Sequence, residues 1–404
     1  MAKYYLYLFF LVLEAVVFLY FFVAALYFSI FSISGLFRYH PRSRKDDRLR
    51  KFAVLIPGYK EDAVIIEVAK QALDQDYPPS RYEVIIIADS FQQTTLDELR
   101  KLPIKVVEVS FEISSKSRAL NKTMSVLPDI YDAVIILDAD NIMARDFITK
   151  MNIALSSGFV AIQGHRKAKN RNTSFAVLDS VSEEINNHIF RKGHRIIGLS
   201  SALIGSGMAF DYPMFKKYMA TIDSFGEDKE LEMKLLRDGQ CIEYCEEAFV
   251  YDEKVQKSHV FMVQRTRWLA NQFIYARQYF GSSLKELFVN GNIDYFDKVF
   301  QQFLPPRIFL LGFLFIISIV SLFLNPLIIS ICWIALTVLC NITLLISVPL
   351  PYFNWQTFKA LLVLPKGFIF MLGSLFRVFK AKRGFGHTVH TVQKGKVQNI
   401  NNRT

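Results

Sequence analysis

The sequence predicts an α/β domain with a largely parallel β-sheet, anchored by apolar helices at both ends of the chain. Two observations lead to this expectation. Hydrophobic residues make up 52% of the 404 residues and concentrate in segments at the two ends. The middle of the chain alternates short β-branched runs with helix-like stretches of about 10 to 15 residues, which is typical of βαβ units.

Four runs in the middle of the chain have the composition of β-strands. Each is short, rich in β-branched residues and almost continuously apolar, and they cover residues 52–57, 82–89, 104–109 and 132–140. Such runs suit strands that are covered on both faces, as in a parallel sheet between two layers of helices. We therefore expect residues 52–280 to form one α/β domain.

Residues 1–37 are expected to form an N-terminal transmembrane anchor. From Tyr4 to Phe37 the only charged residue is Glu14, and an apolar helix needs about 20 residues to cross a bilayer. A cleaved signal peptide would have a shorter apolar core and a small-residue cleavage site, whereas this run begins almost at Met1 and carries aromatic residues throughout, so we expect an uncleaved anchor. Glu14 is expected to be a protonated carboxyl that faces other helices, and a functional role is the alternative.

A basic juxtamembrane segment follows the anchor at residues 38–51 and contains seven Lys and Arg residues. Only Lys3 precedes the apolar run that starts at Tyr4, so the positive-inside rule places the α/β domain in the cytoplasm. A membrane-flanking face accounts for this segment and for the net charge of +11. We therefore expect no nucleic-acid partner.

The C-terminal part of the chain is expected to return to the membrane. Residues 281–306 are assigned to an interfacial segment, and residues 307–350 to a transmembrane hairpin that turns at Asn325-Pro326. Residues 351–380 form either an interfacial amphipathic helix or a further membrane segment, and residues 381–404 a basic cytoplasmic tail. The four cysteines indicate neither a disulfide framework nor a metal cluster.

Polar residues follow three of the four predicted strands. They are Tyr59 and Glu61 after the first strand, Asp89 at the end of the second, and Asp138 and Asp140 at the end of the fourth. Ligands of open α/β sheets bind outside the carboxyl ends of the strands, so we expect these side chains to line one pocket. Carboxylates suit Mg²⁺ or Mn²⁺ and the hydroxyl groups of a sugar or ribose.

Six motifs occur in the order found in one family of enzymes. They are LIPGYKE (55–61), IIADS (86–90), SKSRALN (115–121), DAD (138–140), FGED (225–228) and QRTRW (264–268). The chain thus resembles the membrane-embedded family 2 glycosyltransferases, which include cellulose, chitin and hyaluronan synthases. The resemblance covers about residues 52 to 270, and it implies a GT-A catalytic domain, a Rossmann-like fold of nucleotide-diphospho-sugar transferases, between N- and C-terminal transmembrane helices.

The resemblance implies a donor site for a UDP-sugar. Asp140 would bind Mg²⁺ or Mn²⁺, and Asp138 would bind the metal or the sugar nucleotide, because such a cation stabilises a leaving diphosphate. Capping of a following helix is the alternative role for these two residues. The other donor-site residues that the motifs imply are Tyr59, Glu61, Asp89, Lys116 and Arg267. Lys116 and Asn121 are either nucleotide contacts or part of a solvated helix face.

The FGED and QRTRW motifs imply the residues of the transfer step. By resemblance Asp228, together with Glu227, is the candidate general base that takes the proton of the acceptor hydroxyl. The same position near a helix N-terminus is also what capping predicts. Trp268 would stack beneath the acceptor sugar, with Gln264 and Gly207 also at the acceptor site. The alternatives are a basic helix on the membrane surface for QRTRW and a plain turn for the glycine.

The tail RGFGHTVHTVQKGK (383–396) resembles a short segment of the same family that closes over the bound nucleotide. Phe385, Thr388 and His390 would take the places of its aromatic, threonine and basic residues. A metal site at the two histidines would need further ligands that the tail lacks.

The sequence therefore predicts an inverting, metal-dependent hexosyltransferase of the cell membrane that extends a β-linked polysaccharide from a UDP-sugar, processively. One alternative is a single transfer to a polyprenyl-linked or other lipid acceptor, and another is a non-catalytic membrane sensor of nucleotide sugars. The expected partners are the UDP-sugar donor, a nascent glycan or lipid-linked acceptor, and membrane lipid. Because three spans are few for a polysaccharide channel, a homo-oligomer or a translocation partner is also considered.

Overall fold

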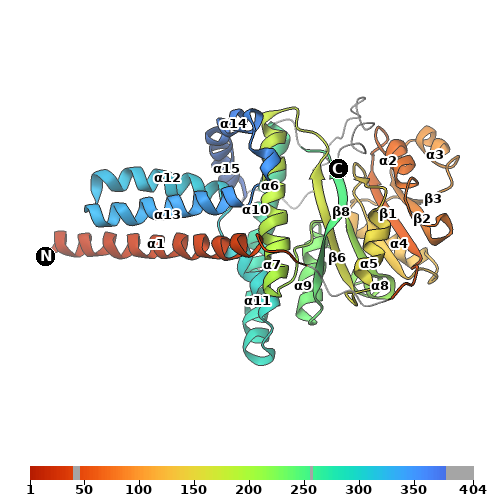
Figure 1. Cartoon of the computed structure of the whole chain (residues 1–404), viewed down its shortest axis with the longest axis horizontal. Coiled ribbons are helices and arrows are strands. Elements are labelled where there is room, and N and C mark those ends of the chain that lie inside the picture. The colour runs from red at the N-terminus through yellow and green to blue at the C-terminus, as the bar shows by residue number, and fades with distance from the viewer. Residues whose placement is uncertain (40–45, 255–257, 379–404) are drawn as a thin grey trace.

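The computed structural model describes residues 1–39, 46–254 and 258–378. Within this part of the chain the strands form one eight-stranded sheet in the order β3-β2-β1-β4-β7-β6-β8-β5 (Figure 1). The strands are β1 Phe52–Tyr59, β2 Tyr82–Asp89, β3 Lys105–Val109, β4 Ala133–Ile136, β5 Ile142–Met143, β6 Ala161–Ala168, β7 Met208–Asp211 and β8 Ile242–Asp252.

The sheet is parallel in one half and mixed in the other. Strands β1 to β4 pair in parallel, as the sequence predicts. Strand β7 runs antiparallel to β4 and β6, β8 is parallel to β6, and β5 is antiparallel to β8. Strand β4 ends at Ile136, so the DAD motif lies after the strand and not within it.

Helices cover both faces of the sheet. Residues of β1 point alternately into two hydrophobic clusters: Ala53 and Leu55 pack with α4, α8 and α9, whereas Val54 and Ile56 pack with α2, α3 and α5. Both sets of strand positions are fully buried, which explains why the run is continuously apolar. The covering helices are α2 Ile65–Ala72, α3 Gln93–Leu99, α4 Lys116–Val126, α5 Phe147–Leu155, α8 Tyr212–Met219 and α9 Glu227–Arg237.

Three long apolar helices project side by side from one end of the molecule (Figure 1). They are α1 Ala2–Ser34, α12 Arg307–Leu324 and α13 Leu327–Ile346. Among the described residues these three helices could cross a membrane by length and composition, or four if the bent pair α14 Trp355–Leu361 and α15 Leu364–Val378 counts as one span; the bend is 42°.

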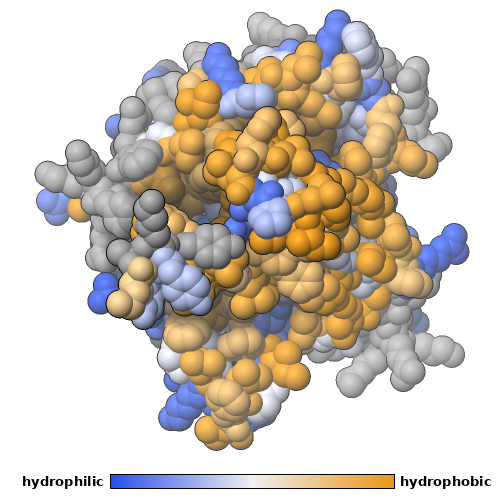
Figure 2. Space-filling view, turned by 90° about the vertical axis from the view of Figure 1, so that its left-hand side faces the viewer, coloured by the Kyte–Doolittle hydropathy of each residue, from blue (hydrophilic) through white to orange (hydrophobic). Residues whose placement is uncertain are grey.

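The surface around the three helices is also apolar. Figure 2 looks at the molecule from the end at which they project, and hydrophobic residues cover most of this face. Other exposed hydrophobic side chains lie where α10 (Ser258–Asn290) ends and α11 (Ile293–Phe300) begins, and in and before α14; they are Phe288, Val289, Ile293, Leu350, Phe353, Trp355 and Phe358.

Glu14 faces other helices, as expected. The Asn325 side-chain amide, at the turn between α12 and α13, donates a hydrogen bond of 2.5 Å to its carboxyl group, and the Trp333 indole donates one of 2.9 Å. The three side chains tie α1 to the hairpin.

A layer of helices lies between the sheet and the apolar helices (Figure 1). It consists of α6 Ser174–Asn186, the π-helical turn η2 Asn187–Gly193, α7 His194–Ile197, α10 Ser258–Asn290 and α11 Ile293–Phe300. Helix α10 continues through residue 280, the expected domain boundary. Short 3₁₀ turns are η1 Pro79–Arg81, η3 Gln301–Phe303 and η4 Leu350–Tyr352.

Candidate active site at the carboxyl ends of the parallel strands

The loops after β1 and β2 hold strained backbone at the edge where the predicted donor site lies. Tyr59 and Asp89 end the two strands in register. The next residues, Lys60 and Ser90, have φ angles of 55° and 60° and are the non-glycine residues with positive φ in the described part of the chain. Such conformations cost about 1–3 kcal/mol each and cluster at ligand sites.

The carboxylate of Asp89 is fixed within this edge. The residue is 2% exposed, Ser90 Oγ donates to its Oδ1 at 2.9 Å, and its carbonyl accepts from Lys60 N at 3.1 Å. Tyr59 is half-buried and Glu61 is buried in the same loop region. The structure thus places these three predicted donor-site residues together at one edge of the sheet.

The loop after β1 packs against the DAD motif. A Cβ atom at Gly58 would lie 2.8 Å from the Phe91 ring and 3.5 Å from Ala139 Cβ. Only a glycine allows this approach without a shift of the ring. The first motif and the DAD motif are therefore neighbours in space.

The DAD motif forms a turn directly after β4. Asp138 N donates to Ser206 Oγ at 2.9 Å, and Asn141 N donates to the Asp138 carbonyl at 3.1 Å. The Asp138 side chain is 35% exposed. Asp140 is buried, and its carboxylate accepts hydrogen bonds from Asn141 Nδ2 at 3.0 Å and Glu253 N at 3.2 Å. Helix capping does not explain these carboxylates, because the next helix, α5, begins only at Phe147.

Lys116 joins three of the motifs. Its ammonium donates to Asp138 Oδ1 at 2.5 Å and to the Gly205 carbonyl at 2.6 Å, and it lies 3.6 Å from Glu227 Oε1. Burial alone would lower the pKa of Lys116, but the carboxylates of Asp138 and Glu227 raise it above its ordinary value. A permanent positive charge therefore lies between the DAD and FGED motifs.

Glu227 and Asp228 begin helix α9, and Gly226 is the N-cap. Neither acid is the N-cap residue, but both lie in the first turn of the helix, which is where the alternative of a favourable interaction with the helix N-terminus places them. Burial, partly opposed by Lys116 and reinforced by Asp228 and Asp138, raises the pKa of Glu227 to about 7. Glu227 can thus hold a proton near neutral pH next to Asp228.

Asp228 is half-buried and lies beside Gly205. A Cβ atom at Gly205 would lie 3.5 Å from Asp228 Oδ2 and 3.8 Å from Lys116 Nζ, and the φ angle of Gly205 is +83°. A glycine at this position leaves room next to the carboxylate, and its backbone conformation disfavours any side chain.

In QRTRW the arginine that pairs with another helix is Arg265, and not the predicted Arg267. Arg265 forms an ion pair of 2.6 Å with Asp179 of α6, and its guanidinium lies 4.3 Å from the centre of the Trp268 ring. Trp268 is 40% exposed. The predicted residues Gln264 and Arg267 are both half-buried on the same helix. The motif itself marked this segment, but it did not indicate which arginine pairs with α6.

Gly207 and Asn121 have structural partners. Gly207 has a φ angle of +64°, and a Cβ atom there would lie 2.5 Å from Val250 Cγ1. This packing explains the glycine without an acceptor. The Asn121 amide donates to the Ile222 carbonyl at 2.7 Å, so it ties α4 to the segment before FGED and is not part of a solvated face.

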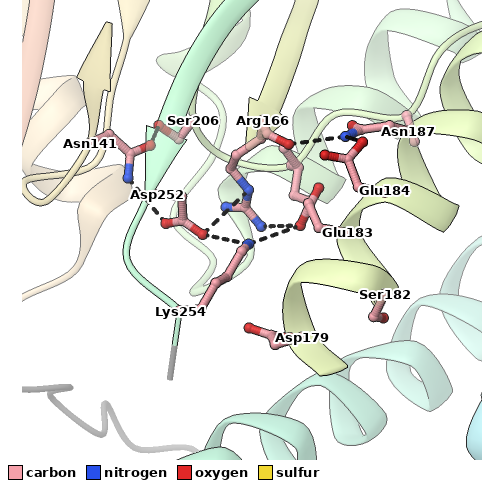
Figure 3. A network of polar contacts seen from close by, with 12 residues as sticks. Asn141, Arg166, Asp179, Ser182, Glu183, Glu184, Asn187, Ser206, Asp252 and Lys254 are labelled. Atoms are coloured by element: carbon pink, nitrogen blue, oxygen red, sulfur yellow. Dashed lines mark hydrogen bonds and ion pairs between the residues drawn. The ribbon is translucent and has the colours of Figure 1, made fainter. Parts of the chain in front are cut away.

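Sequence reasoning missed three residues that hold the DAD turn. Asn141 Nδ2 donates to Asp252 Oδ1 at 3.2 Å as well as to Asp140, and its Oδ1 accepts a hydrogen bond from Ser206 Oγ (Figure 3). Burial and the charge of Asp140 raise the pKa of Asp252, although Arg166 and Lys254 oppose them. The position of Asn141 directly after DAD is a usable signal, whereas none of the six motifs includes or adjoins Asp252.

The acidic residues fit a hard divalent cation by donor chemistry. No group of three or more His, Cys, Asp or Glu residues in the described ranges forms a complete metal cluster. Mg²⁺-type sites commonly use one or two carboxylates and complete their shell with substrate phosphates and water. Asp138, which is partly exposed, and the neighbouring Asp140 supply such oxygen ligands.

Phe385, Thr388 and His390 lie outside the described residues.

Comparisons with known proteins agree with this architecture. The family model "Glycosyltransferase like family 2" matches residues 50–271. The probable glycosyltransferase YdaM of Bacillus subtilis is 24% identical over 309 residues, covering 69% of this chain and 70% of YdaM. The beta-monoglucosyldiacylglycerol synthase of Nostoc sp. is 26% identical over 231 residues, covering 54% of this chain and 47% of that enzyme, so the chain spans about half of this relative's length.

A solved structure shares the fold. The mannosyltransferase PcManGT from Pyrobaculum calidifontis, solved in complex with GDP-Man and Mn²⁺, superposes with a TM-score of 0.54 at 14% identity and covers 91% of this chain and 98% of its own. The family match spans more than half of the chain, and the mixed sheet agrees with the GT-A fold that the motifs predict. The chain is a GT-A glycosyltransferase and belongs to the glycosyltransferase like family 2.

Proposed function

We propose that the chain is an inverting transferase that moves a hexose from a UDP-sugar to an acceptor hydroxyl at the surface of a membrane. The observation that carries this proposal is the position of Lys116, 2.5 Å from Asp138 and 3.6 Å from Glu227. One half-buried cation brings the predicted donor motif and the predicted base motif together. This supports a single site for the diphosphate and the attacking hydroxyl.

Asp228 is proposed as the general base. Asp228 is half-buried, and its carboxylate lies close to the Gly205 backbone. The acceptor oxygen forms a bond to the anomeric carbon, and its proton moves to Asp228. The bond between the anomeric carbon and the diphosphate oxygen breaks, and the electron pair leaves with the diphosphate. Attack opposite the leaving group inverts the anomeric configuration, so an α-linked donor gives a β-linked product.

Asp138 and Asp140 are proposed to hold Mg²⁺ or Mn²⁺. Their oxygen ligands suit either ion, and PcManGT, which has a similar fold, was solved with Mn²⁺. When bound, the cation would neutralise negative charge on the leaving diphosphate. Tyr59, Glu61 and Asp89 are proposed to contact the nucleoside, and Lys116 and Arg267 to add positive charge near the phosphates.

The acceptor is proposed to be a growing β-linked glycan. Support comes from Trp268, whose 40% exposed ring on α10 offers a surface on which a sugar can stack. Gln264 and Gly207 are proposed to lie at the same acceptor site. The basic segment after α1 supports a cytoplasmic catalytic domain in the cell membrane.

A lipid acceptor that receives a single sugar is the second candidate. Three candidate spans among the described residues are few for a polysaccharide channel. The Nostoc relative is named as a synthase of a glucosylated diacylglycerol. A polymer would therefore need a second copy of the chain or a translocation partner, whereas a lipid acceptor would not.

A donor screen on the full chain in membranes tests the proposal. Labelled UDP-glucose, UDP-N-acetylglucosamine and GDP-mannose are each supplied with Mn²⁺, with Mg²⁺ or with EDTA, and the products are sized. Incorporation from a UDP-sugar that requires a divalent ion is the expected result. A ladder indicates glycan extension, and one added sugar in the lipid fraction indicates the second candidate. Incorporation from GDP-mannose alone would refute the UDP assignment, and incorporation in EDTA would refute the metal requirement.

A further inference from the structure

A buried ionic network lies next to Asn141, the residue that follows the DAD motif (Figure 3). Glu183 of α6 is its centre: Oε2 accepts from Arg166 Nη2 at 2.9 Å and lies 3.5 Å from Lys254 Nζ, and Oε1 accepts from Arg191 Nη1 at 3.0 Å. Lys254 also pairs with Asp252 at 2.8 Å. All five residues are at least half-buried, and Glu183, Arg166, Arg191 and Lys254 are each less than 9% exposed.

The network is costly to form and must be held in one arrangement. Burial alone would raise the pKa of Glu183, but Arg166, Lys254 and Arg191 hold it well below its ordinary range. Removing one partner of a buried ion pair leaves an uncompensated charge. Each member therefore constrains the position of the others, and Glu183 contacts three of them.

The network reaches the DAD turn through Asp252 and Asn141. Asp252 lies 2.8 Å from Lys254 and 3.7 Å from Arg166 Nε, and it accepts from Asn141 Nδ2 at 3.2 Å. Asn141 also donates to Asp140 and accepts from Ser206, the hydroxyl that Asp138 N contacts. Figure 3 shows Asn141 and Ser206 next to Asp252 on the sheet side of the network.

The other end of the network is tied to the membrane-proximal helices. Asp179 and Ser182 lie on the same helix as Glu183 (Figure 3). Asp179 pairs with Arg265 of QRTRW at 2.6 Å, and Ser182 Oγ accepts from Arg307, the first residue of α12, at 2.9 Å. Helix α6 thus contacts α10, which carries QRTRW, and α12, the first helix of the hairpin. Through Glu183 it is also linked to the DAD turn, the predicted metal site.

We propose that Glu183 is a positioning residue for the DAD turn. It fixes Arg166 and Lys254, these fix Asp252, and Asp252 fixes Asn141, so that the carboxylates of Asp138 and Asp140 are held ready for the metal and the diphosphate. The role rests on the proposed function of those two residues. It predicts that loss of Glu183 weakens donor binding and leaves the chemical step at saturating donor nearly unchanged.

A double-mutant cycle tests this role on the full chain in detergent. The single variants Glu183→Gln and Asn141→Ala and the double variant are compared with wild type for the Kd of UDP and of GDP, each with Mn²⁺. For whichever of the two nucleotides binds the wild-type protein, we expect each single change to raise the Kd about tenfold. If both act through one pathway, the double variant should be no weaker than the weaker-binding single variant. Residues that act independently give multiplicative effects within about twofold, and that outcome would overturn the proposal.

Controls separate positioning from general destabilisation. Glu246→Gln removes a partly exposed ion pair with Lys192 and should leave the Kd unchanged. The donor KM of Glu183→Gln should rise about tenfold while kcat stays within about threefold, and an equal fall of kcat would contradict positioning. If Glu183→Gln does not fold, Arg166→Lys replaces it, because a lysine keeps the charge but cannot contact Glu183 and Asp252 through separate nitrogens.

Failure of this role and failure of the proposed function give different results. Wild-type protein that binds and transfers a sugar while the cycle is multiplicative refutes only the role of Glu183. Wild-type protein that binds neither UDP nor GDP with Mn²⁺ refutes the proposed function, and the role of Glu183 with it.

Discussion

The Lys116 ammonium lies 2.5 Å from the Asp138 carboxylate, so the first acid of the DAD motif is already paired with a residue from another motif. The same ammonium is 3.6 Å from Glu227. Lys116 therefore contacts both the DAD motif, where the diphosphate is expected to bind, and the FGED motif, where the acceptor proton is expected to be taken up.

Replacing this charge is expected to disable both motifs together. Lys116→Met keeps most of the side-chain stem and leaves Asp138 and Glu227 without their shared cation. We expect kcat/KM to fall at least about 100-fold, which corresponds to about 3 kcal/mol. Steady-state kinetics with the active donor measures this. Lys122→Met, at an exposed position of the same helix, is the matched control, and an equal loss in both variants would remove Lys116 from the site.

Asp228 is expected to be needed for transfer and not for donor binding. Asp228→Asn keeps the size of the side chain and removes its basicity, so turnover should fall at least about 1,000-fold, while the Kd for UDP with Mn²⁺ stays within about threefold. Product formation and calorimetric binding are measured on the same preparation. Asp223→Asn, at an exposed acid shortly before this motif, should behave like wild type. Normal turnover of Asp228→Asn would exclude the base role.

Asp140 is expected to contribute to metal-dependent binding. In Asp140→Ala the Kd for UDP in Mn²⁺ should rise about tenfold or more and approach the value in EDTA, because a carboxylate ligand is lost. Asp129→Ala removes an exposed acid that pairs with Lys216 and serves as the control. A variant at position 140 that binds UDP as wild type does, with the same dependence on Mn²⁺, would contradict the ligand assignment.

Glu227 is expected to make stability depend on pH below neutrality. Burial raises the pKa of Glu227 from 4.5 to about 7, so between these values the folded state binds a proton that the unfolded state has released. The free energy of unfolding should therefore fall as pH rises from about 4.5 to about 7, by an amount on the order of 3 kcal/mol, and level off above. Thermal unfolding of wild type and Glu227→Gln at pH 5.5 and 8 measures this. The glutamine variant should gain more stability relative to wild type at pH 8 than at pH 5.5, and a constant difference at both values would disprove the assignment.

Glu14 is expected to stabilise the packing of α1 on the hairpin. Glu14→Leu removes the acceptor of the bonds from Asn325 and Trp333, each worth about 1 kcal/mol in a membrane environment. The thermal midpoint in detergent should fall for Glu14→Leu and stay close to wild type for Glu14→Gln, which keeps an acceptor oxygen. Equal midpoints for all three proteins would show that these bonds do not matter for stability.

The first half of the sheet could be predicted because its strands are buried on both faces. Residues of β1 alternate between two hydrophobic clusters, and this leaves a continuous apolar run in the sequence. Strand β6 reads AIQGHRKA and includes Arg166 and His165, which are paired with Glu183 and Glu184. Its polar residues are satisfied only by tertiary partners, so no local pattern marks it as a strand.

In the candidate site, too, some residues could be predicted from motifs in the sequence, whereas others depend on tertiary contacts. Motif order indicated Asp138, Glu227, Asp228 and Lys116, and the structure brings these residues together. The contact between Asn141 and Asp252 joins positions 111 residues apart, and no spacing rule relates them. The pairing of Asp179 with Arg265, and not with Arg267, likewise depends on how α6 and α10 are rotated against each other.

The length of α1 bears on how thick a bilayer the apolar helices could cross. The helix has 33 residues and is about 50 Å long, whereas α12 and α13 have 18 and 20 residues and measure about 27 and 30 Å. Since Glu14 meets the turn of the hairpin, α1 continues past this turn without the hairpin beside it, and the exposed Tyr4 and Tyr5 lie near its tip. In a bilayer whose hydrocarbon core is thicker than the hairpin is long, α1 alone would then be long enough to cross the full core. Asn325 would lie within the acyl-chain region, where Glu14 accepts its hydrogen bond.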